Sequence, residues 1–274
     1  MAEITNKEEF EKWLWNQNQP VLIVIAVRTA LRVFPFVLDT IPEHTDKSDT
    51  KSLALLTARA LLASAVAGNV PTADAKLAAH SAHTTISTNL ALLGLGIVIG
   101  NESDTKSRSV VISHDATALS ANFARSAAAY AAETAAASAI ATVIVSLDDS
   151  AANLARNTTL TVAYSDANSI IPETAAGLLE TPIWGDEQFE GVIKSAWNKF
   201  LKNTLPKNPE FTFWRDWYQG FLDGKPLDWN LQREVALIPD ADWEKGPAHI
   251  ADMIAEIKAR FDVQNAAKKA KEYL

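Results

Sequence analysis

Residues 211–261, FTFWRDWYQGFLDGKPLDWNLQREVALIPDADWEKGPAHIADMIAEIKARF, decide the fold of the C-terminal part of the chain. Six of the eight tryptophans lie in the last third of the sequence, whereas Ala, Leu, Val and Thr dominate the rest. Trp214, Trp217, Tyr218 and Phe221 follow one another at i, i+3, i+4 and i+7. Because these positions share one face of an α-helix, the spacing predicts a helix whose aromatic face packs into a core.

Proline, glycine and capping residues divide this segment into short helices. Asn208, followed by proline, predicts the start of a helix over 209–223, and Gly224 predicts its end. Asp228 can cap the next helix, and Pro247 can open the last one. The sequence therefore predicts a compact helical module with an aromatic core.

The N-terminal residues carry helix signals of a similar kind. Thr5 or Asn6 can act as an N-cap, with Glu8 or Glu9 three residues further on, which is a capping-box pattern. Pro20 then precedes the apolar run VLIVIAVRTALRVF, which predicts a second helix. A β-strand over VLIVIAV alone is the alternative.

All of the elements predicted along the chain are helical. Further helices are expected over 53–68, from Pro71 towards residue 99, over 115–147 and over 151–168, with polar loops over 41–52 and 101–109. No hairpin pattern and no βαβ alternation is present. These patterns predict an all-α fold: a multi-helix bundle with a long Ala-rich central region and a compact aromatic C-terminal helical module.

The connection 169–187 is the best candidate for a domain boundary, because proline and glycine interrupt it repeatedly. It divides the chain into an Ala-rich helical bundle, 1–180, and an aromatic-rich C-terminal helical module, 181–274. One continuous domain is the alternative.

Composition and charge exclude several classes of function. The chain has 274 residues, no cysteine and a formal net charge of −8. The absence of cysteine excludes disulfides, thiolate metal sites and a cysteine nucleophile. The only dense basic stretch is KKAKEYL at the end, so a nucleic-acid partner is not expected. The acidic, polar N-terminus does not resemble a signal peptide, which favours a cytoplasmic location.

No catalytic motif stands above the background of the sequence. The glycines Gly94, Gly96 and Gly100 do not meet the G-x-G-x-x-G spacing, because position 99 is Ile. No serine lies in G-x-S-x-G, and no P-loop is present. We therefore expect neither a catalytic site nor a cofactor.

His80 and His83 are the candidates for a metal site. They lie three residues apart, so one helix face can present both. Two histidines leave a metal site incomplete, and a third ligand would have to come from elsewhere in the chain. A metal-dependent enzyme built inside a helical bundle is therefore an alternative function.

Trp217, Trp229 and Trp243 are the candidates for binding a partner, because tryptophan is enriched at the energetic centres of protein interfaces. The helical stripe that contains Trp217 is equally typical of a core-facing helix. Trp229 and Trp243 lie near predicted capped turns, where an indole can reach a partner.

Two apolar runs are long enough to be considered as membrane spans. Arg28 and Arg32 interrupt the run 20–38, and Glu133 lies within the Ala-rich run 126–147. Charges near the centre of a span cost about 2.5–3.5 kcal/mol each. We interpret both runs as buried helices, and a membrane-associated helical protein is the minor alternative.

Both ends of the chain resemble a group of Ala-rich helical proteins of unknown function from alphaproteobacteria. The resemblance rests on the C-terminal segments W-x2-W-Y, GKPLD, REVALIPD and WExGPAxI, at Trp214–Tyr218, Gly224–Asp228, Arg233–Asp240 and Trp243–Ile250. The segments Glu8–Leu14 and Ala26–Pro35 and the Ala-rich stretch around Ala127–Ala141 match as well. The resemblance implies a bacterial, cytoplasmic helical protein and implies no activity.

The missing catalytic motifs and the Trp-rich module together predict a non-enzymatic helical protein that binds another protein. A regulatory protein, a scaffold or a component of a conflict system would fit this prediction. Self-association into a homo-oligomer is a further expectation.

Overall fold

A computed structural model describes residues 3–39, 41, 48–92, 149–185 and 189–272. Every regular element in these ranges is helical, which confirms the predicted all-α helical bundle. The α-helices are α1 (Lys7–Trp15), α2 (Gln19–Asp39), α3 (Ser48–Asn69), α4 (Ala73–Leu92), α7 (Asp149–Ser169), α8 (Gly191–Lys199), α9 (Thr212–Leu222), α10 (Trp229–Ala236), α11 (Asp240–Trp243) and α12 (Pro247–Glu272). Shorter 3-10 or π segments are η1 (Pro172–Glu180), η2 (Phe200–Thr204), η3 (Leu205–Lys207) and η4 (Pro209–Phe211). The helix predicted over 115–147 and the glycines from Gly94 to Gly100 lie outside the described residues.

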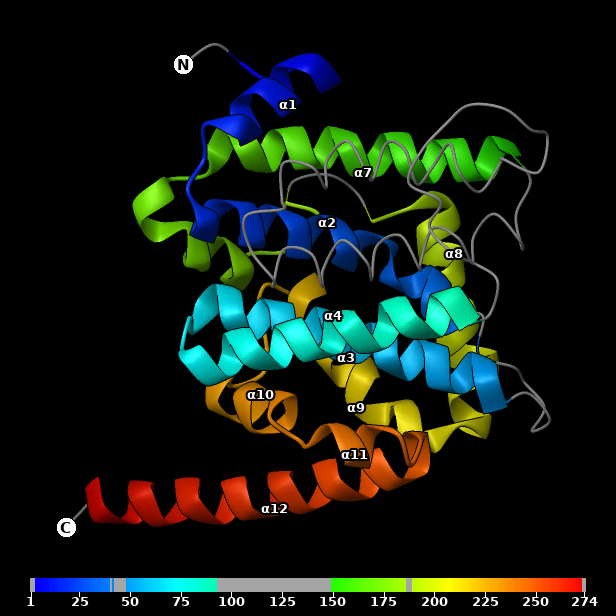
Figure 1. The fold of residues 1–274 in the computed structure, drawn as a ribbon, viewed down its shortest axis with the longest axis vertical. Helices are drawn as coiled ribbons and strands as arrows, with labels where there is room; N and C mark the ends of the chain where they lie inside the picture. Colours follow the sequence, from blue (N-terminus) through cyan, green and yellow to red (C-terminus); the bar gives the residue numbers. More distant parts are fainter. Residues whose placement is uncertain (1–2, 40, 42–47, 93–148, 186–188, 273–274) are drawn as a thin grey trace.

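Helix α2 lies at the centre of the molecule and packs against α3, α7, α8 and η1. Figure 1 shows α7 and α1 on one side of α2, with α3 and α4 on the other. Helices α10 to α12 lie beyond α3, and α12 forms the edge furthest from α1. The two ends of the chain therefore enclose the central helices.

Helix α1 begins with the predicted capping pattern. The Asn6 side chain accepts a hydrogen bond from the Glu9 backbone N–H at 3.0 Å. The Glu9 carboxylate in turn accepts from the Thr5 backbone N–H at 2.9 Å. These bonds satisfy donors that have no partner within the helix.

Helix α2 is apolar on every side, and 17 of its 21 residues are buried, so it forms the axis of the core. Two windows, 19–39 in α2 and 51–69 in α3, are long and apolar enough to cross a membrane by length and composition. They are 94% and 89% buried inside the protein, as core helices are. Membrane association stays an alternative, and the second predicted span, 126–147, lies outside the described residues.

Helices α3 and α4 form an antiparallel pair built on alanine. Ala75, Ala79 and Ala82 recur on one face of α4 and are buried, and their small side chains allow the two helices to approach closely. Helix α3 begins at Ser48, within the predicted loop 41–52, so that loop is shorter than predicted. An ion pair between residues far apart in the sequence anchors the first turns of α3. The ammonium group of Lys51 lies 3.0 Å from the carboxylate of Glu210.

The start of the aromatic helix differs from the prediction. Asn208 does not cap α9, because its side-chain amide donates to the Thr204 carbonyl oxygen at 2.8 Å. The segment Pro209–Phe211 instead forms the 3-10 turn η4, and α9 begins at Thr212. The predicted cap at Asp228 is confirmed, since its carboxylate accepts from the Asn230 backbone N–H at 2.8 Å.

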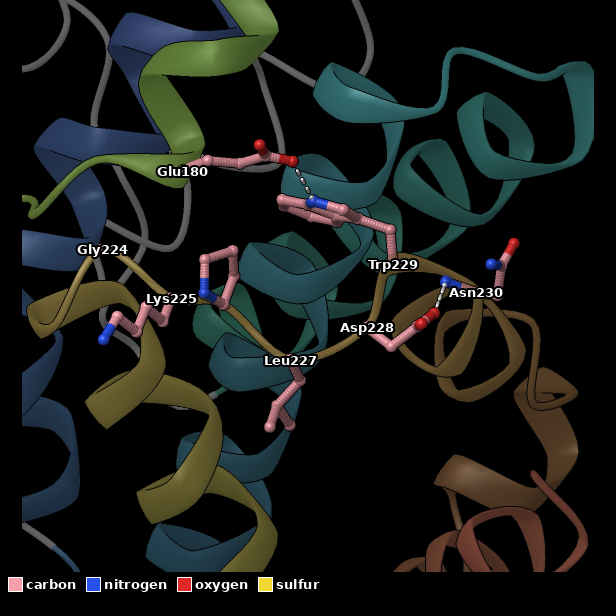
Figure 2. A pocket seen from close by; sticks show the side chains of 8 residues that line it. Glu180, Gly224, Lys225, Leu227, Asp228, Trp229 and Asn230 are labelled. Carbon is pink, nitrogen blue, oxygen red and sulfur yellow. Dashed lines mark hydrogen bonds between the residues drawn. The ribbon is translucent and has the colours of Figure 1, made fainter. Parts of the chain in front are cut away.

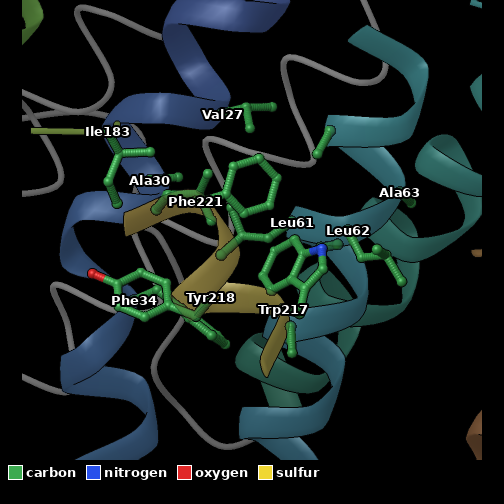
Figure 3. Close-up of a cluster of buried hydrophobic side chains, with 14 of the residues drawn as sticks. Val27, Ala30, Phe34, Leu61, Leu62, Ala63, Ile183, Trp217, Tyr218 and Phe221 are labelled. Carbon is green, nitrogen blue, oxygen red and sulfur yellow. The ribbon is translucent and has the colours of Figure 1, made fainter. Parts of the chain in front are cut away.

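The hydrophobic core is continuous across residue 180. Figure 3 shows side chains of α2 and α3 packed against the aromatic face of α9. The Phe34 ring lies 5.9 Å from the Trp217 ring and 5.8 Å from the Tyr218 ring, centroid to centroid. Residues on either side of the predicted boundary thus share one core.

Candidate functional site

The three candidate tryptophans occupy different environments. Trp217 and Trp243 are 0% and 2% exposed, so neither indole can touch a partner in this conformation. This corrects the prediction that they contact a partner directly, because the aromatic stripe faces inwards. Trp229, at the start of α10, is half-buried and lines a groove of about 430 Å³.

This groove, named the Trp229 groove below, lies between the end of η1 and the start of α10 (Figure 2). It is lined by Glu180, Gly224, Lys225, Pro226, Leu227, Asp228, Trp229 and Asn230. Charged, polar and aromatic side chains therefore share one concave surface.

Two close backbone approaches build the groove, and each requires glycine. Gly224 has φ +65°, and a Cβ there would lie 2.5 Å from the Pro182 ring. A Cβ at Gly220 would lie 2.8 Å from the Lys225 carbonyl oxygen. The chain after α9 consequently lies flat against both α9 and the segment that follows η1.

Trp229 is fixed at the surface from two sides. Its indole N–H donates to the Glu180 carboxylate at 2.9 Å (Figure 2). Its ring meets the Phe221 ring edge to face, with the centroids 6.2 Å apart. Trp229 therefore presents a rigid aromatic surface that reaches solvent while remaining joined to the core.

The buried Trp217 supports the groove from behind. Its indole N–H donates to the Gln232 side-chain oxygen at 2.7 Å. The Gln232 amide then donates to the Leu227 carbonyl oxygen at 2.6 Å. Trp217 is thus a positioning residue for the groove wall rather than a residue of the binding surface.

A buried cluster of Arg28, Arg32 and Asp166, named the arginine cluster below, fixes the opposite wall. Arg28 Nη2 donates to the Pro182 carbonyl oxygen at 2.9 Å, and Arg32 Nε donates to the Ile183 carbonyl oxygen at 2.8 Å. Arg28 Nη1 also donates to the carbonyl oxygens of residues 178 and 181. Helix α2 therefore holds the segment that carries Glu180.

Asp166 supplies the counter-charge in the arginine cluster. Arg28 Nε lies 2.9 Å from its Oδ2 atom, and Arg32 Nη2 donates to the same oxygen. Asp166 can neutralise only one of the two guanidinium groups. The second positive charge is stabilised by the surrounding backbone carbonyl groups. Burial lowers the pKa of Arg32 to about 10, with Asp166 opposing this shift, and the group stays charged at neutral pH.

Three buried polar atoms near this cluster lack a hydrogen bond of standard geometry among the described residues: Arg32 Nη1, Trp184 Nε1 and the Tyr218 hydroxyl, the last two lying close enough for a weak interaction with each other. Burial raises the pKa of the Tyr218 hydroxyl far above its usual value, and Trp184 and Arg32 oppose the shift only in part. The hydroxyl therefore stays protonated and cannot act as a counter-ion for Arg32.

A third buried arginine, Arg59 on α3, joins α3 and α4 to the C-terminal helices. Its guanidinium carbon lies 5.0 Å from the centroid of the Trp243 ring, and it forms an ion pair with Asp240. The Ser81 hydroxyl on α4 donates to the same carboxylate at 2.6 Å. Trp243 is thus an internal contact for a cation rather than a free surface.

The structure does not bring a metal site together in the part of the chain that it describes. His80 is exposed on α4, and the side chain of His83 lies outside the described residues. Within the described ranges, no group of three His, Cys, Asp or Glu side chains could hold a metal ion.

Comparison of the chain with protein-family models, with curated proteins and with solved structures finds no match.

Sequence reasoning identified Trp229 and the cap at Asp228 but missed Glu180 and Lys225. Glu180 lies at the end of η1, 49 residues before the indole that it binds. No local pattern links these two positions, because the contact depends on the arginine cluster and on Gly224.

Proposed function

We propose that this protein acts by binding another protein through the Trp229 groove, without catalysing a reaction. The observation that carries the proposal is the position of Trp229, which is half-buried, accessible to solvent and held by the Glu180 carboxylate at 2.9 Å. Tryptophans in this situation are frequent energetic centres of protein interfaces.

Rigidity supports this role. A side chain that is already ordered loses little conformational entropy when a partner covers it, so more of the contact energy appears as affinity. The Glu180 hydrogen bond and the Phe221 contact hold the Trp229 indole in one orientation. The cap at Asp228 fixes the first turn of α10 beneath it.

The surroundings of the groove also favour a macromolecular partner. The groove is a shallow surface between two chain segments, and its rim consists of the exposed side chains of Glu180, Lys225, Asp228 and Asn230. Protein interfaces combine an aromatic centre with a polar rim in this way.

Site-specific crosslinking in cells tests the proposal. A photo-reactive phenylalanine derivative at Asn230, on the rim, is expected to crosslink one protein that mass spectrometry can identify. The additional change Trp229→Ala is expected to abolish the crosslink. The same photo-reactive residue at Gln264, exposed on α12, serves as the matched control position.

A crosslink between two copies of this chain would identify the partner as a second copy, which light scattering of the purified protein can verify. Circular dichroism of Trp229→Ala establishes that the variant is folded. Crosslinking that is unchanged by Trp229→Ala in a folded protein would contradict the proposal.

A further inference from the structure

The charges of the Trp229 groove indicate the chemistry of its occupant, and this inference rests on the function proposed above. Glu180 uses one carboxylate oxygen to accept the Trp229 indole N–H, and Asp228 uses one oxygen to cap α10. Within the described residues, the second oxygen of each carboxylate has no hydrogen-bond donor. Two negative groups with free acceptor capacity therefore flank one indole.

The single basic side chain in the groove does not neutralise this arrangement. Lys225 points away from Trp229 and from both carboxylates (Figure 2), and it makes no ion pair with another described residue. Its exposed ammonium group is held by no contact and is free to remain in solvent.

We propose that the Trp229 groove binds an arginine side chain presented by the partner protein. The guanidinium group is planar, so it can stack on the indole while its N–H groups donate to the neighbouring Glu180 carboxylate, and the negative charge of Asp228 at the rim adds to the attraction. It is also more weakly hydrated than an ammonium group, which reduces the penalty for leaving water. Lysine would supply the same charge without the planar stacking surface.

The net charge of the chain supports an arginine-bearing partner. With a net charge of −8, the protein attracts basic surfaces over distances of about 8 Å at physiological salt, which speeds encounter without selecting a site. Selection depends on the groove itself, where the Glu180 carboxylate lies beside the Trp229 indole and the Asp228 carboxylate adds negative charge at the start of α10.

Two substitutions remove the charges while preserving the local structure. Glu180→Gln keeps a side-chain oxygen that can accept the Trp229 indole N–H. Asp228→Asn keeps the helix cap, because Asn and Asp cap helices about equally well. Each variant therefore tests the charge of the groove separately from its shape.

Fluorescein-labelled tetra-arginine and tetra-lysine peptides are suitable probes, measured by fluorescence anisotropy at physiological ionic strength. We expect tetra-arginine to bind more tightly than tetra-lysine, and each groove variant to weaken its binding about 5- to 10-fold. Glu256→Gln, an exposed position on α12, changes the net charge by the same amount and is expected to change the affinity less than about twofold.

Three outcomes would overturn the inference: no binding at millimolar peptide, equal binding of the two peptides, or equal weakening by Glu256→Gln. Displacement of the peptide by spermine at equal charge concentration would assign the groove to a small polyamine instead. If Trp229→Ala abolishes the cellular crosslink but Glu180→Gln and Asp228→Asn do not, the arginine inference fails while the proposed interaction stands.

Discussion

The arginine cluster and the Arg59–Asp240 pair use the same two residue types in contrasting surroundings. All three guanidinium groups are buried, but the Asp166 side chain is 7% exposed and the Asp240 side chain is 59% exposed. Arg28 and Arg32 also donate to backbone carbonyl groups within residues 178–183, whereas the Arg59 guanidinium group lies over the Trp243 ring in a cation–π contact.

The arginine cluster is therefore closed to solvent, whereas solvent reaches the Asp240 side of the Arg59–Asp240 pair. Each is called a junction below, because it joins separate segments of the chain. A buried charge that loses its partner is strongly destabilising, since neither water nor another ion replaces it. The Asp240 carboxylate, which is 59% exposed, keeps much of its hydration, so only the Arg59 side of that pair is desolvated. We therefore expect the η1 segment to be fixed on α2, and the contact of α3 and α4 with the C-terminal helices to open more easily.

The largest effect is expected from Asp166→Asn, which leaves two buried guanidinium groups without a counter-charge. The free energy of unfolding should fall by about 3–5 kcal/mol. Urea denaturation followed by circular dichroism measures it. A loss below about 1 kcal/mol would show that the carbonyl groups alone satisfy the two arginines.

Arg32→Met should destabilise the protein less than Asp166→Asn. It leaves Arg28 and Asp166 as a neutral pair, but it removes both hydrogen bonds to the Ile183 carbonyl oxygen. The expected loss is about 1–3 kcal/mol, the penalty for one unsatisfied buried acceptor. Urea denaturation of both variants under identical conditions compares the two losses of stability. A larger loss for Arg32→Met than for Asp166→Asn would contradict the idea that uncompensated positive charge causes the larger effect.

Asp240→Asn removes the counter-charge of the buried Arg59 but leaves an amide oxygen in its place, so it should lower the free energy of unfolding by about 1–3 kcal/mol, less than Asp166→Asn does. The amide oxygen of asparagine can still accept from Arg59 and from Ser81. Thermal and urea unfolding of this variant and of Asp166→Asn form a matched pair of Asp→Asn changes. Equal losses in the two variants would remove the distinction between the junctions.

The smallest effect concerns pH. Burial acts to raise the pKa of Asp240, but hydrogen bonds from Ser81 and Arg59 outweigh it, and the pKa is lowered overall. A carboxylate with a lowered pKa in the folded state stabilises the protein above its unfolded pKa of about 3.9. That stability is lost as the pH falls through the folded value.

The difference in stability between the wild-type protein and Asp240→Asn should therefore shrink as the pH is lowered from neutrality to below about 4. Urea denaturation across this range measures it. A difference that stays constant would mean that the charge of Asp240 does not contribute.

Local signals in the sequence were sufficient to predict much of the fold. The caps at Asn6 and Asp228 and the opening of α12 at Pro247 all involve residues within a few positions of one another. The aromatic stripe of α9 was equally readable, because helical periodicity is a property of a short segment. One local signal failed: Asn208 bonds backwards to the Thr204 carbonyl oxygen instead of capping α9.

The arginine cluster and the groove were beyond sequence reasoning. Arg28 and Arg32 served only as evidence against a membrane span, because their partner Asp166 is 138 and 134 residues away. Glu180 carried no signal, since its role depends on where the arginine cluster places it. Such contacts follow from tertiary packing, which a single sequence does not display.

The separation of Arg32 from Asp166 also has a consequence for biosynthesis. At roughly 5–20 residues per second, the chain takes about 7–27 s to extend over the 134 positions from Arg32 to Asp166. Throughout this interval the apolar helix α2 has been synthesised, while the acceptors for its two guanidinium groups do not yet exist. The two guanidinium groups can therefore reach their final partners only after residue 183 has been synthesised.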